Sequence, residues 1–395
     1  MTDSGTPTSP TTFPDIPAAN APAMLEHGGR LHQAAREYNL PLERWLDLST
    51  GINPLGWPVD SLTLPAHLWQ RLPEDEDGLL EAARRYYGAR YLLPVAGSQA
   101  AIRSLPRVLH EEHGPLTVIC LQPIYNEHPA AWSAAGHIVE SVAWERFTSG
   151  LNFFAPPEIL EQPDRPLPGD PPNGGKGKKG SPHVVVLCNP NNPTGHQLPA
   201  ENILALARQL NAQGSWLVVD EAFADSRPEL SVAAYAGTYS YPRLIVLRSL
   251  GKFFGLAGLR VGFLCAAPAL LGSLNEWLGP WTVSRVARHI ATHALNDTVW
   301  QAITQTRLQD QQQRLNTLLQ PLTRPDAQGQ PMVRSSDLFC WIQPHHPADW
   351  LYDQFARQGI LIRHFSETGT LRFGLPGVET EWQRLIKCLN HIHTL

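Results

Sequence analysis

Paired cysteines and long apolar runs are both absent from this sequence, and each absence excludes a class of protein. The five cysteines lie far apart, at Cys120, Cys188, Cys265, Cys340 and Cys388. They form no C-x-x-C pair and are typical of buried thiols in a reducing compartment. No apolar run reaches the ~20 residues that span a bilayer, and the Thr-, Ser- and Pro-rich start lacks the features of a signal peptide. We therefore expect a soluble cytoplasmic protein without membrane contact, and no metal site.

A strong charge of one sign is also missing. The formal net charge is −5 and the isoelectric point is about 6.3, which argues against a nucleic-acid partner. The chain has 395 residues, enough to bury a large core and to form two domains.

Lysine is scarce, and this scarcity draws attention to one position. The five lysines are Lys176, Lys178, Lys179, Lys252 and Lys387. Only Lys252 lies inside an apolar segment, between a predicted strand at Arg243–Leu247 and an apolar run at Val261–Cys265. It is either a lysine that reaches the surface or a buried amine with a lowered pKa, suited to a Schiff base with a carbonyl cofactor.

The rest of the chain alternates between predicted strands and helices. Strands are expected at 116–121, 184–188 and 216–221, with helices at 76–86 and 200–212. This alternation predicts a mainly parallel sheet with its functional residues at the carboxyl ends of the strands. Residues 155–182 are dense in Pro, Gly and charge and are interpreted as a flexible surface insertion.

Several polar residues stand where strands end or helices begin. Gly97, Ser98 and Gln99 open a helix, whose N-terminus suits a phosphate, although Ser98 alone is equally a plain N-cap. Asp220 ends a predicted strand. Ser249 and Arg260 flank Lys252 and are suited to binding an anionic cofactor tail.

Taken together, the motifs resemble those of fold-type I pyridoxal-phosphate enzymes, from about residue 25 to the end apart from the insertion. The HGG at 27–29, TGINPLG, NPNNPTG, DEAF and GLAGLRVGF resemble the threonine-phosphate decarboxylases of cobalamin biosynthesis, close relatives of histidinol-phosphate aminotransferases. The resemblance implies an α/β fold, in which a large domain with a mainly parallel seven-stranded sheet precedes a smaller C-terminal α+β domain. We accordingly expect a disordered tail (1–20), an N-terminal arm (21–55), a large cofactor-binding domain (56–285) and a small domain (286–395).

The resemblance also implies roles for individual residues. Lys252 would hold pyridoxal 5'-phosphate, and Asp220 would bind the ring nitrogen. The other implied cofactor ligands are Gly97, Ser98, Gln99, Tyr125, Asn192, Ser249 and Arg260. Arg372 would bind the substrate carboxylate, and the other implied substrate ligands are His27, Arg30, Asn53 and Arg363. His27 is far from Lys252 in sequence, so one alternative places it in the site of a neighbouring subunit.

The implied reaction is decarboxylation of L-threonine O-3-phosphate, a small phosphorylated amino acid, by a homodimer. A histidinol-phosphate-type aminotransferase with the same residues is the nearest alternative. A third possibility, a transcription regulator of the same fold, needs a DNA-binding module, for which residues 1–20 are too short.

Two positions depart from the pattern of the relatives. Phe223 stands where many have a tyrosine. Leu72 stands where many have a tyrosine that reaches across the dimer to the cofactor phosphate.

Overall fold

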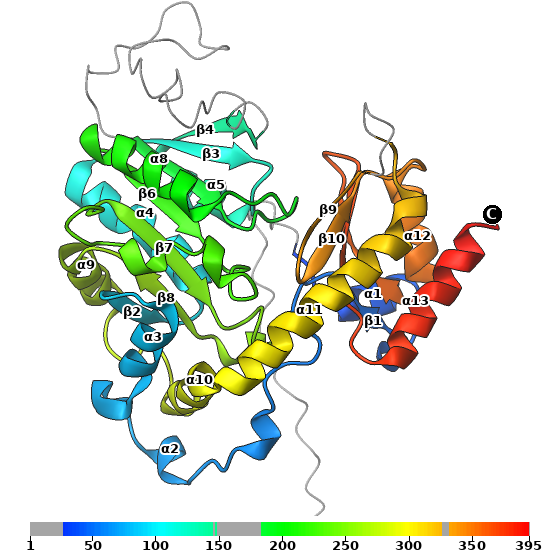
Figure 1. The fold of residues 1–395 in the computed structure, drawn as a ribbon, viewed down its shortest axis with the longest axis horizontal. Helices are drawn as coiled ribbons and strands as arrows, with labels where there is room; N and C mark the ends of the chain where they lie inside the picture. The colour runs from blue at the N-terminus through cyan, green and yellow to red at the C-terminus, as the bar shows by residue number, and fades with distance from the viewer. Residues whose placement is uncertain (1–26, 145–146, 148–182, 326–331, 395) are drawn as a thin grey trace, which may run out of the picture.

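The protein is built around two β-sheets joined by one long helix (Figure 1). The computed structural model describes residues 27–144, 147, 183–325 and 332–394. The predicted tail (1–20) and insertion (155–182) lie outside these ranges. In the described part of the chain, no helix combines the length and the apolar character needed to cross a membrane.

The larger sheet has seven strands in the order β2-β8-β7-β6-β5-β3-β4. The strands are β2 (Leu92–Val95), β3 (Thr117–Gln122), β4 (Ile138–Ala143), β5 (His183–Cys188), β6 (Trp216–Asp220), β7 (Leu244–Ser249) and β8 (Gly262–Cys265). Only β8 runs against its neighbours, β2 and β7; the other pairs are parallel. The predicted mainly parallel seven-stranded sheet is confirmed.

The central strands β5 and β6 are almost entirely apolar because helices cover both faces of this sheet, whereas the edge strand β4 is largely exposed. In β5, Val185 and Leu187 belong to one core cluster, whereas Val184 and Val186 belong to the other. Alternate side chains of a strand point to opposite faces, so a strand buried on both faces shows a continuous apolar run. The covering helices are α3 (Leu79–Tyr87), α4 (Ser98–His113), α5 (Glu127–Ala134), α8 (Ala200–Ala212), α9 (Pro268–Leu278) and α10 (Arg285–Asn296).

The smaller sheet is antiparallel, in the order β12-β13-β10-β9. Its strands are β9 (Val333–Ser336), β10 (Phe339–Ile342), β12 (Arg363–Phe365) and β13 (Thr370–Gly374), accompanied by α12 (Ala348–Arg357) and α13 (Glu379–Ile392). Helix α11 (Thr298–Leu319) leads from the large sheet to the small one (Figure 1). Arg363 and Arg372 face each other across the β12–β13 pair.

The N-terminal arm packs on the small domain. Helix α1 (Leu31–Glu37) contributes Ala34 to a core cluster with Ala356 and Leu361. Strand β1 (Leu46–Asp47) pairs in parallel with β11 (Ile360–Leu361), and Figure 1 shows the arm beside the C-terminal helices. Helix α10, which begins at the predicted domain boundary at 285/286, packs against α3 and α2 (His67–Gln70). The division of the chain at this boundary stays a prediction.

Candidate active site

A cavity of about 280 Å³ opens where the parallel strands end. Strands β5, β6 and β7 end side by side at Cys188, Asp220 and Ser249, and all three residues line the cavity. Most of the predicted site residues lie together on its wall: His27, Ser98, Gln99, Tyr125, Asn192, Asp220, Ser249, Lys252, Arg260 and Arg372. Residues as far apart in sequence as His27 and Arg372 therefore meet at one edge of the sheet.

Lys252 follows β7 and projects into this cavity. Its Nζ donates a hydrogen bond to the Thr50 carbonyl oxygen at 3.2 Å and lies 5.3 Å from the centre of the Phe223 ring. Desolvation, followed by the positive charge of Arg372, lowers the pKa of Lys252 from 10.5 to about 8. At neutral pH the unprotonated amine, the form that attacks a carbonyl group, is therefore far more populated than for an ordinary lysine.

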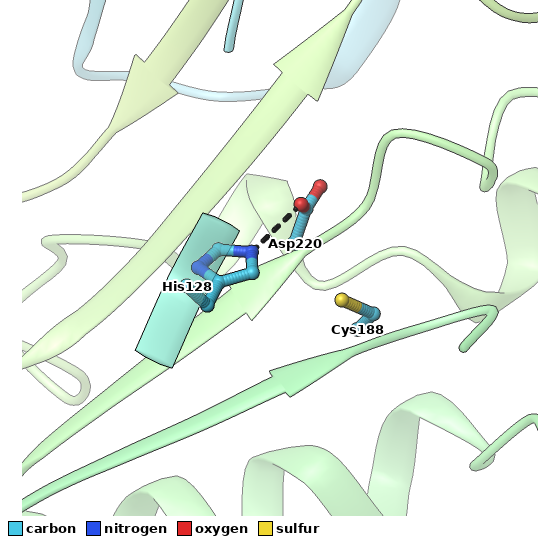
Figure 2. Close-up of side chains that lie close together, drawn as sticks. All are labelled: His128, Cys188 and Asp220. Carbon is cyan, nitrogen blue, oxygen red and sulfur yellow. Dashed lines mark hydrogen bonds and ion pairs between the residues drawn. The ribbon is translucent and has the colours of Figure 1, made fainter. Parts of the chain in front are cut away.

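Asp220 is held from two sides. Its Oδ1 accepts a hydrogen bond from the Ala222 backbone N–H at 3.0 Å, and its Oδ2 lies 2.9 Å from His128 Nε2 (Figure 2). His128 comes from α5 and is 1% exposed. Because a carboxylate only accepts hydrogen bonds, the imidazole donates from Nε2. Asp220 is thus fixed as a hydrogen-bond acceptor in the cavity wall.

Cys188 lies close to this pair, and the three side chains have metal-ligand atoms within 4.8 Å of one another. In Figure 2 the dashed bond joins only His128 and Asp220. Burial raises the pKa of the Cys188 thiol well above its usual range. The three side chains form a hydrogen-bonded pair beside a buried thiol.

Glycine makes the start of α4 accessible to an anion. Gly97 has φ +73°, and a Cβ atom there would lie 2.5 Å from Arg260 Nη2. On the other side, a Cβ on Gly262 would lie 2.6 Å from the Ser98 backbone nitrogen. The N-terminus of this 16-residue helix carries partial positive charge, and the Arg260 guanidinium and the Ser249 hydroxyl line the same cavity. This combination fits a phosphate group.

Tyr125 and Asn192 also line the cavity. The Tyr125 hydroxyl donates to Gln99 Oε1 at 3.3 Å, and burial raises the pKa of Tyr125 to about 12. Asn192 Oδ1 accepts a hydrogen bond from Arg372 Nη1. The amide nitrogen is therefore the end of Asn192 that a ligand in the cavity would meet.

Arg372 is a buried cation with an unused donor. Its Nη2 donates to the Ser49 carbonyl oxygen at 2.8 Å, but its buried Nε has no hydrogen-bond partner in the described structure. Burial, followed by repulsion from Arg363, lowers the pKa of Arg372 to about 9. A carboxylate ligand would satisfy the unused donor and compensate the charge.

A second cavity of about 60 Å³ adjoins the first. The two share His27, Gly28, Tyr125, Asn192 and Arg372, and the second adds Arg363. His27 thus reaches the site of its own chain. The HGG motif makes this approach possible, because a Cβ on Gly28 would lie 2.5 Å from the Ser49 carbonyl oxygen.

Three positions that were singled out in the sequence lie outside both cavities. Arg30 precedes α1 and lines neither cavity. Asn53, which we expected to bind substrate, is 2% exposed and also lines neither cavity. Asn53 Nδ2 donates to the Phe253 carbonyl oxygen at 2.8 Å, and the Asn53 backbone N–H donates to the Lys252 carbonyl oxygen at 3.0 Å. Asn53 therefore holds the backbone of the loop that carries Lys252. Leu72 is 59% exposed and away from both cavities.

His128 and Glu127 escaped the sequence analysis. Both follow Tyr125 closely and lie in the first turn of α5. An acidic residue is common there because it interacts favourably with the positive end of the helix dipole. Their burial, which gives them partners in the site, follows only from the packing of α5 on the sheet.

The chain belongs to the aminotransferase class I and II family, whose model matches residues 75–387. It is 43% identical to a threonine-phosphate decarboxylase of Pseudomonas aeruginosa, over 92% of this chain and 96% of that protein. A threonine-phosphate decarboxylase of Sinorhizobium sp is 36% identical over 89% and 94% of the two chains. The histidinol-phosphate aminotransferase of Sinorhizobium meliloti in complex with pyridoxal-5'-phosphate has the same fold, with a TM-score of 0.71, 17% identity and coverage of 94% and 99%.

Proposed function

We propose that this protein is a pyridoxal-phosphate-dependent enzyme that decarboxylates L-threonine O-3-phosphate to (R)-1-amino-2-propanol O-2-phosphate, for the nucleotide loop of cobalamin. One observation carries the proposal: the lysine cavity continues into a smaller cavity lined by Arg363, Arg372 and His27. An amino acid phosphate has two anionic groups and needs two cationic subsites. The similarity to the decarboxylase of P. aeruginosa, which extends over 96% of that protein, supports the same substrate.

The residues present fit the cofactor. The lowered pKa of Lys252 suits covalent attachment of an aldehyde through Nζ. Asp220, oriented by His128, would accept a hydrogen bond from the ring nitrogen. The cradle at Gly97, in which Arg260 already occupies the space of a side chain, would hold the phosphate. Asn192, Tyr125, Ser98, Gln99 and Ser249 complete this proposed cofactor site.

When bound, pyridoxal phosphate supplies a protonated ring that withdraws electrons from the Cα of the attached amino acid. The chain's residues would do the rest. Arg372 would orient the carboxylate through its unused Nε donor. As the Cα–carboxylate bond breaks and CO2 leaves, a proton takes its place on Cα, and Lys252 Nζ is the group placed to deliver it. The apolar Phe223 ring beside Nζ helps to keep the amine poorly solvated.

The phosphate of the substrate would lie between Arg363 and His27 in the second cavity. The two arginines face each other across β12 and β13, so a substrate with a carboxylate at one end and a phosphate at the other would meet one guanidinium with each. Arg30 and Asn53 are outside this arrangement. We further propose a homodimer in the cytoplasm; the five buried free cysteines suit a reducing compartment.

The decisive test is CO2 release from L-threonine O-3-phosphate without an added keto acid. Formation of a keto acid and pyridoxamine phosphate instead would favour an aminotransferase. Arg363→Ala should lower kcat/KM for threonine phosphate by roughly 30- to several-thousand-fold, the effect of losing one desolvated charge partner, with little change for threonine. Arg372→Ala should impair both substrates alike, because both carry the carboxylate.

The cofactor assignment has its own test. Borohydride should fix the cofactor on Lys252, and peptide mapping should find the label there. Labelling of the exposed Lys387 would contradict the assignment. Sedimentation of the holoenzyme tests the proposed dimer.

A further inference from the structure

A buried carboxylate, Glu127, lies behind two residues that line the cavities, His27 and Gln99. It opens α5 and is 7% exposed. Its Oε1 lies 2.9 Å from His27 Nε2. Its Oε2 accepts hydrogen bonds from Gln99 Nε2 at 2.5 Å and from Arg103 Nη1 at 3.4 Å. Burying a carboxylate costs free energy unless it is paired and hydrogen-bonded, so the partners of Glu127 decide whether its position is favourable.

The bond to Gln99 sets the direction of a short relay. A carboxylate only accepts, so the Gln99 amide must donate to Glu127. Its carbonyl end then faces the Tyr125 hydroxyl, which donates to it at 3.3 Å. Both ends of the Gln99 side chain are thus used within the protein. The second N–H of Nε2 and the backbone of Gln99 are left for the cofactor phosphate, and Tyr125 is held at the cavity wall.

The bond to His27 acts on the other cavity. By the same argument His27 donates from Nε2, so the ring is anchored at that nitrogen while it lines both cavities. His27 belongs to the arm, which packs on the small domain, whereas Glu127 belongs to the large domain. This bond fastens the arm across the mouth of the site.

Arg103 does not account for the burial of Glu127. Its side chain is 60% exposed and its Nη1 is 3.4 Å from Oε2, and an exposed ion pair of this kind contributes little to stability. The two bonds that lead into the site, to His27 and Gln99, are the shorter ones.

We propose that Glu127 is a positioning residue that gives the site its preference for phosphorylated amino acids. It holds His27 at the second cavity and, through Gln99, holds Tyr125 at the first. The proposal rests on the proposed function, because it assigns the second cavity to the substrate phosphate. It predicts that loss of the Glu127 charge affects phosphorylated substrates selectively.

Glu127→Gln keeps the shape of the side chain and removes its charge. We expect kcat/KM for threonine phosphate to fall about tenfold to a hundredfold, as for the loss of one hydrogen bond to a charged group, mainly through KM. For unphosphorylated threonine the change should stay below about threefold. Arg103→Gln, which removes the exposed partner of the same carboxylate, is the matched control and should behave as wild type.

A double-mutant cycle separates positioning from general support of the fold. If Glu127 acts through His27, Glu127→Gln should add little in a His27→Ala background. Equal losses for both substrates, or full additivity in the cycle, would overturn the proposal. If Glu127→Gln fails to fold, Glu127→Asp, which withdraws the carboxylate by one methylene, should show the same selective loss. Failure of both variants to fold would also overturn it, since Glu127 would then be primarily structural.

A binding measurement keeps this test independent of the reaction. Calorimetric titration of the holoenzyme with inorganic phosphate should give a Kd that rises about tenfold in Glu127→Gln and stays unchanged in Arg103→Gln. Unchanged phosphate binding in both variants would refute the role of Glu127. A wild-type enzyme that binds phosphate but releases no CO2 from threonine phosphate would refute the proposed function alone.

Discussion

Replacing Lys252 by methionine should stabilise the cofactor-free protein at neutral pH. The pKa of Lys252 is lowered from 10.5 to about 8, chiefly by burial, and a shift of this size corresponds to a folding cost of ~3 kcal/mol when the amine is protonated. The methionine variant loses the hydrogen bond to the Thr50 carbonyl oxygen, a loss of ~1 kcal/mol. The net expectation is a gain of ~2 kcal/mol at pH 7.

The stability difference between the variant and the wild type should depend on pH. Below pH 8 both folded and unfolded lysine are protonated, so the cost is present in full. Between about pH 8 and 10.5 the unfolded state binds more protons, and wild-type stability rises with pH. The advantage of the variant should therefore shrink over this window and disappear above it.

Urea unfolding of both cofactor-free proteins at pH 7, 8, 9 and 10, at one protein concentration, measures the difference. Lys387→Met, at an exposed position of α13, is the matched control and should show no such trend. A Lys252→Met protein that is less stable than wild type at pH 7, or whose advantage is independent of pH, would refute the reasoning. Saturating cofactor should reverse the order, because only the wild type gains covalent binding energy.

Three further predictions concern the supports of the site. His128→Phe should retain the cofactor but lower kcat about tenfold, the effect of one lost hydrogen bond to the charged Asp220, with kcat and cofactor content as the measurements. Gly97→Ala should weaken the cofactor at least tenfold in a fluorescence titration, since its Cβ would lie 2.5 Å from Arg260 Nη2; normal affinity would contradict the cradle. Arg248 is buried between the carboxylates of Glu221 and Asp225. Arg248→Leu leaves both carboxylates without their cationic partner, so it should lower the free energy of unfolding by ~3–5 kcal/mol and the thermal midpoint by ~5 °C in calorimetry.

The sequence was sufficient for the central strands of the sheet and for the residues at their carboxyl ends, whereas the number of seven strands came from the family resemblance and β2 and β4 were not located. Strands that are buried on both faces appear in the sequence as continuous apolar runs. The predicted helix at 200–212 coincides with α8. Asp220 and Lys252 were found because strand ends and apolar surroundings are visible in the chain itself. The packing of α10 on α3 is not a local property of either helix, so the domain boundary at 285/286 stays a prediction.

The polar partners of the site were less predictable. Asn53 stands in a loop rich in turn residues, and nothing in the chain distinguishes an amide that binds a ligand from one that braces the backbone of Phe253. Glu127 and His128 were missed for the complementary reason. Their roles depend on contacts with residues 28 and 92 positions away, Gln99 and Asp220, which only the folded chain brings together.

The residues assigned to the cofactor and those assigned to the substrate come mainly from different parts of the chain. The groups assigned to the cofactor, such as Lys252 and Asp220, come from strand ends and loops of the large domain. The groups assigned to the substrate, Arg363 and Arg372, come from the small sheet, and His27 comes from the arm that packs on it. We therefore expect substitutions of Arg363, which lines the second cavity but not the first, to change which anionic groups are accepted without disturbing the cofactor. Glu127 is the exception, since it is a large-domain residue bonded to the arm, so it couples substrate choice to the part of the molecule that does the chemistry.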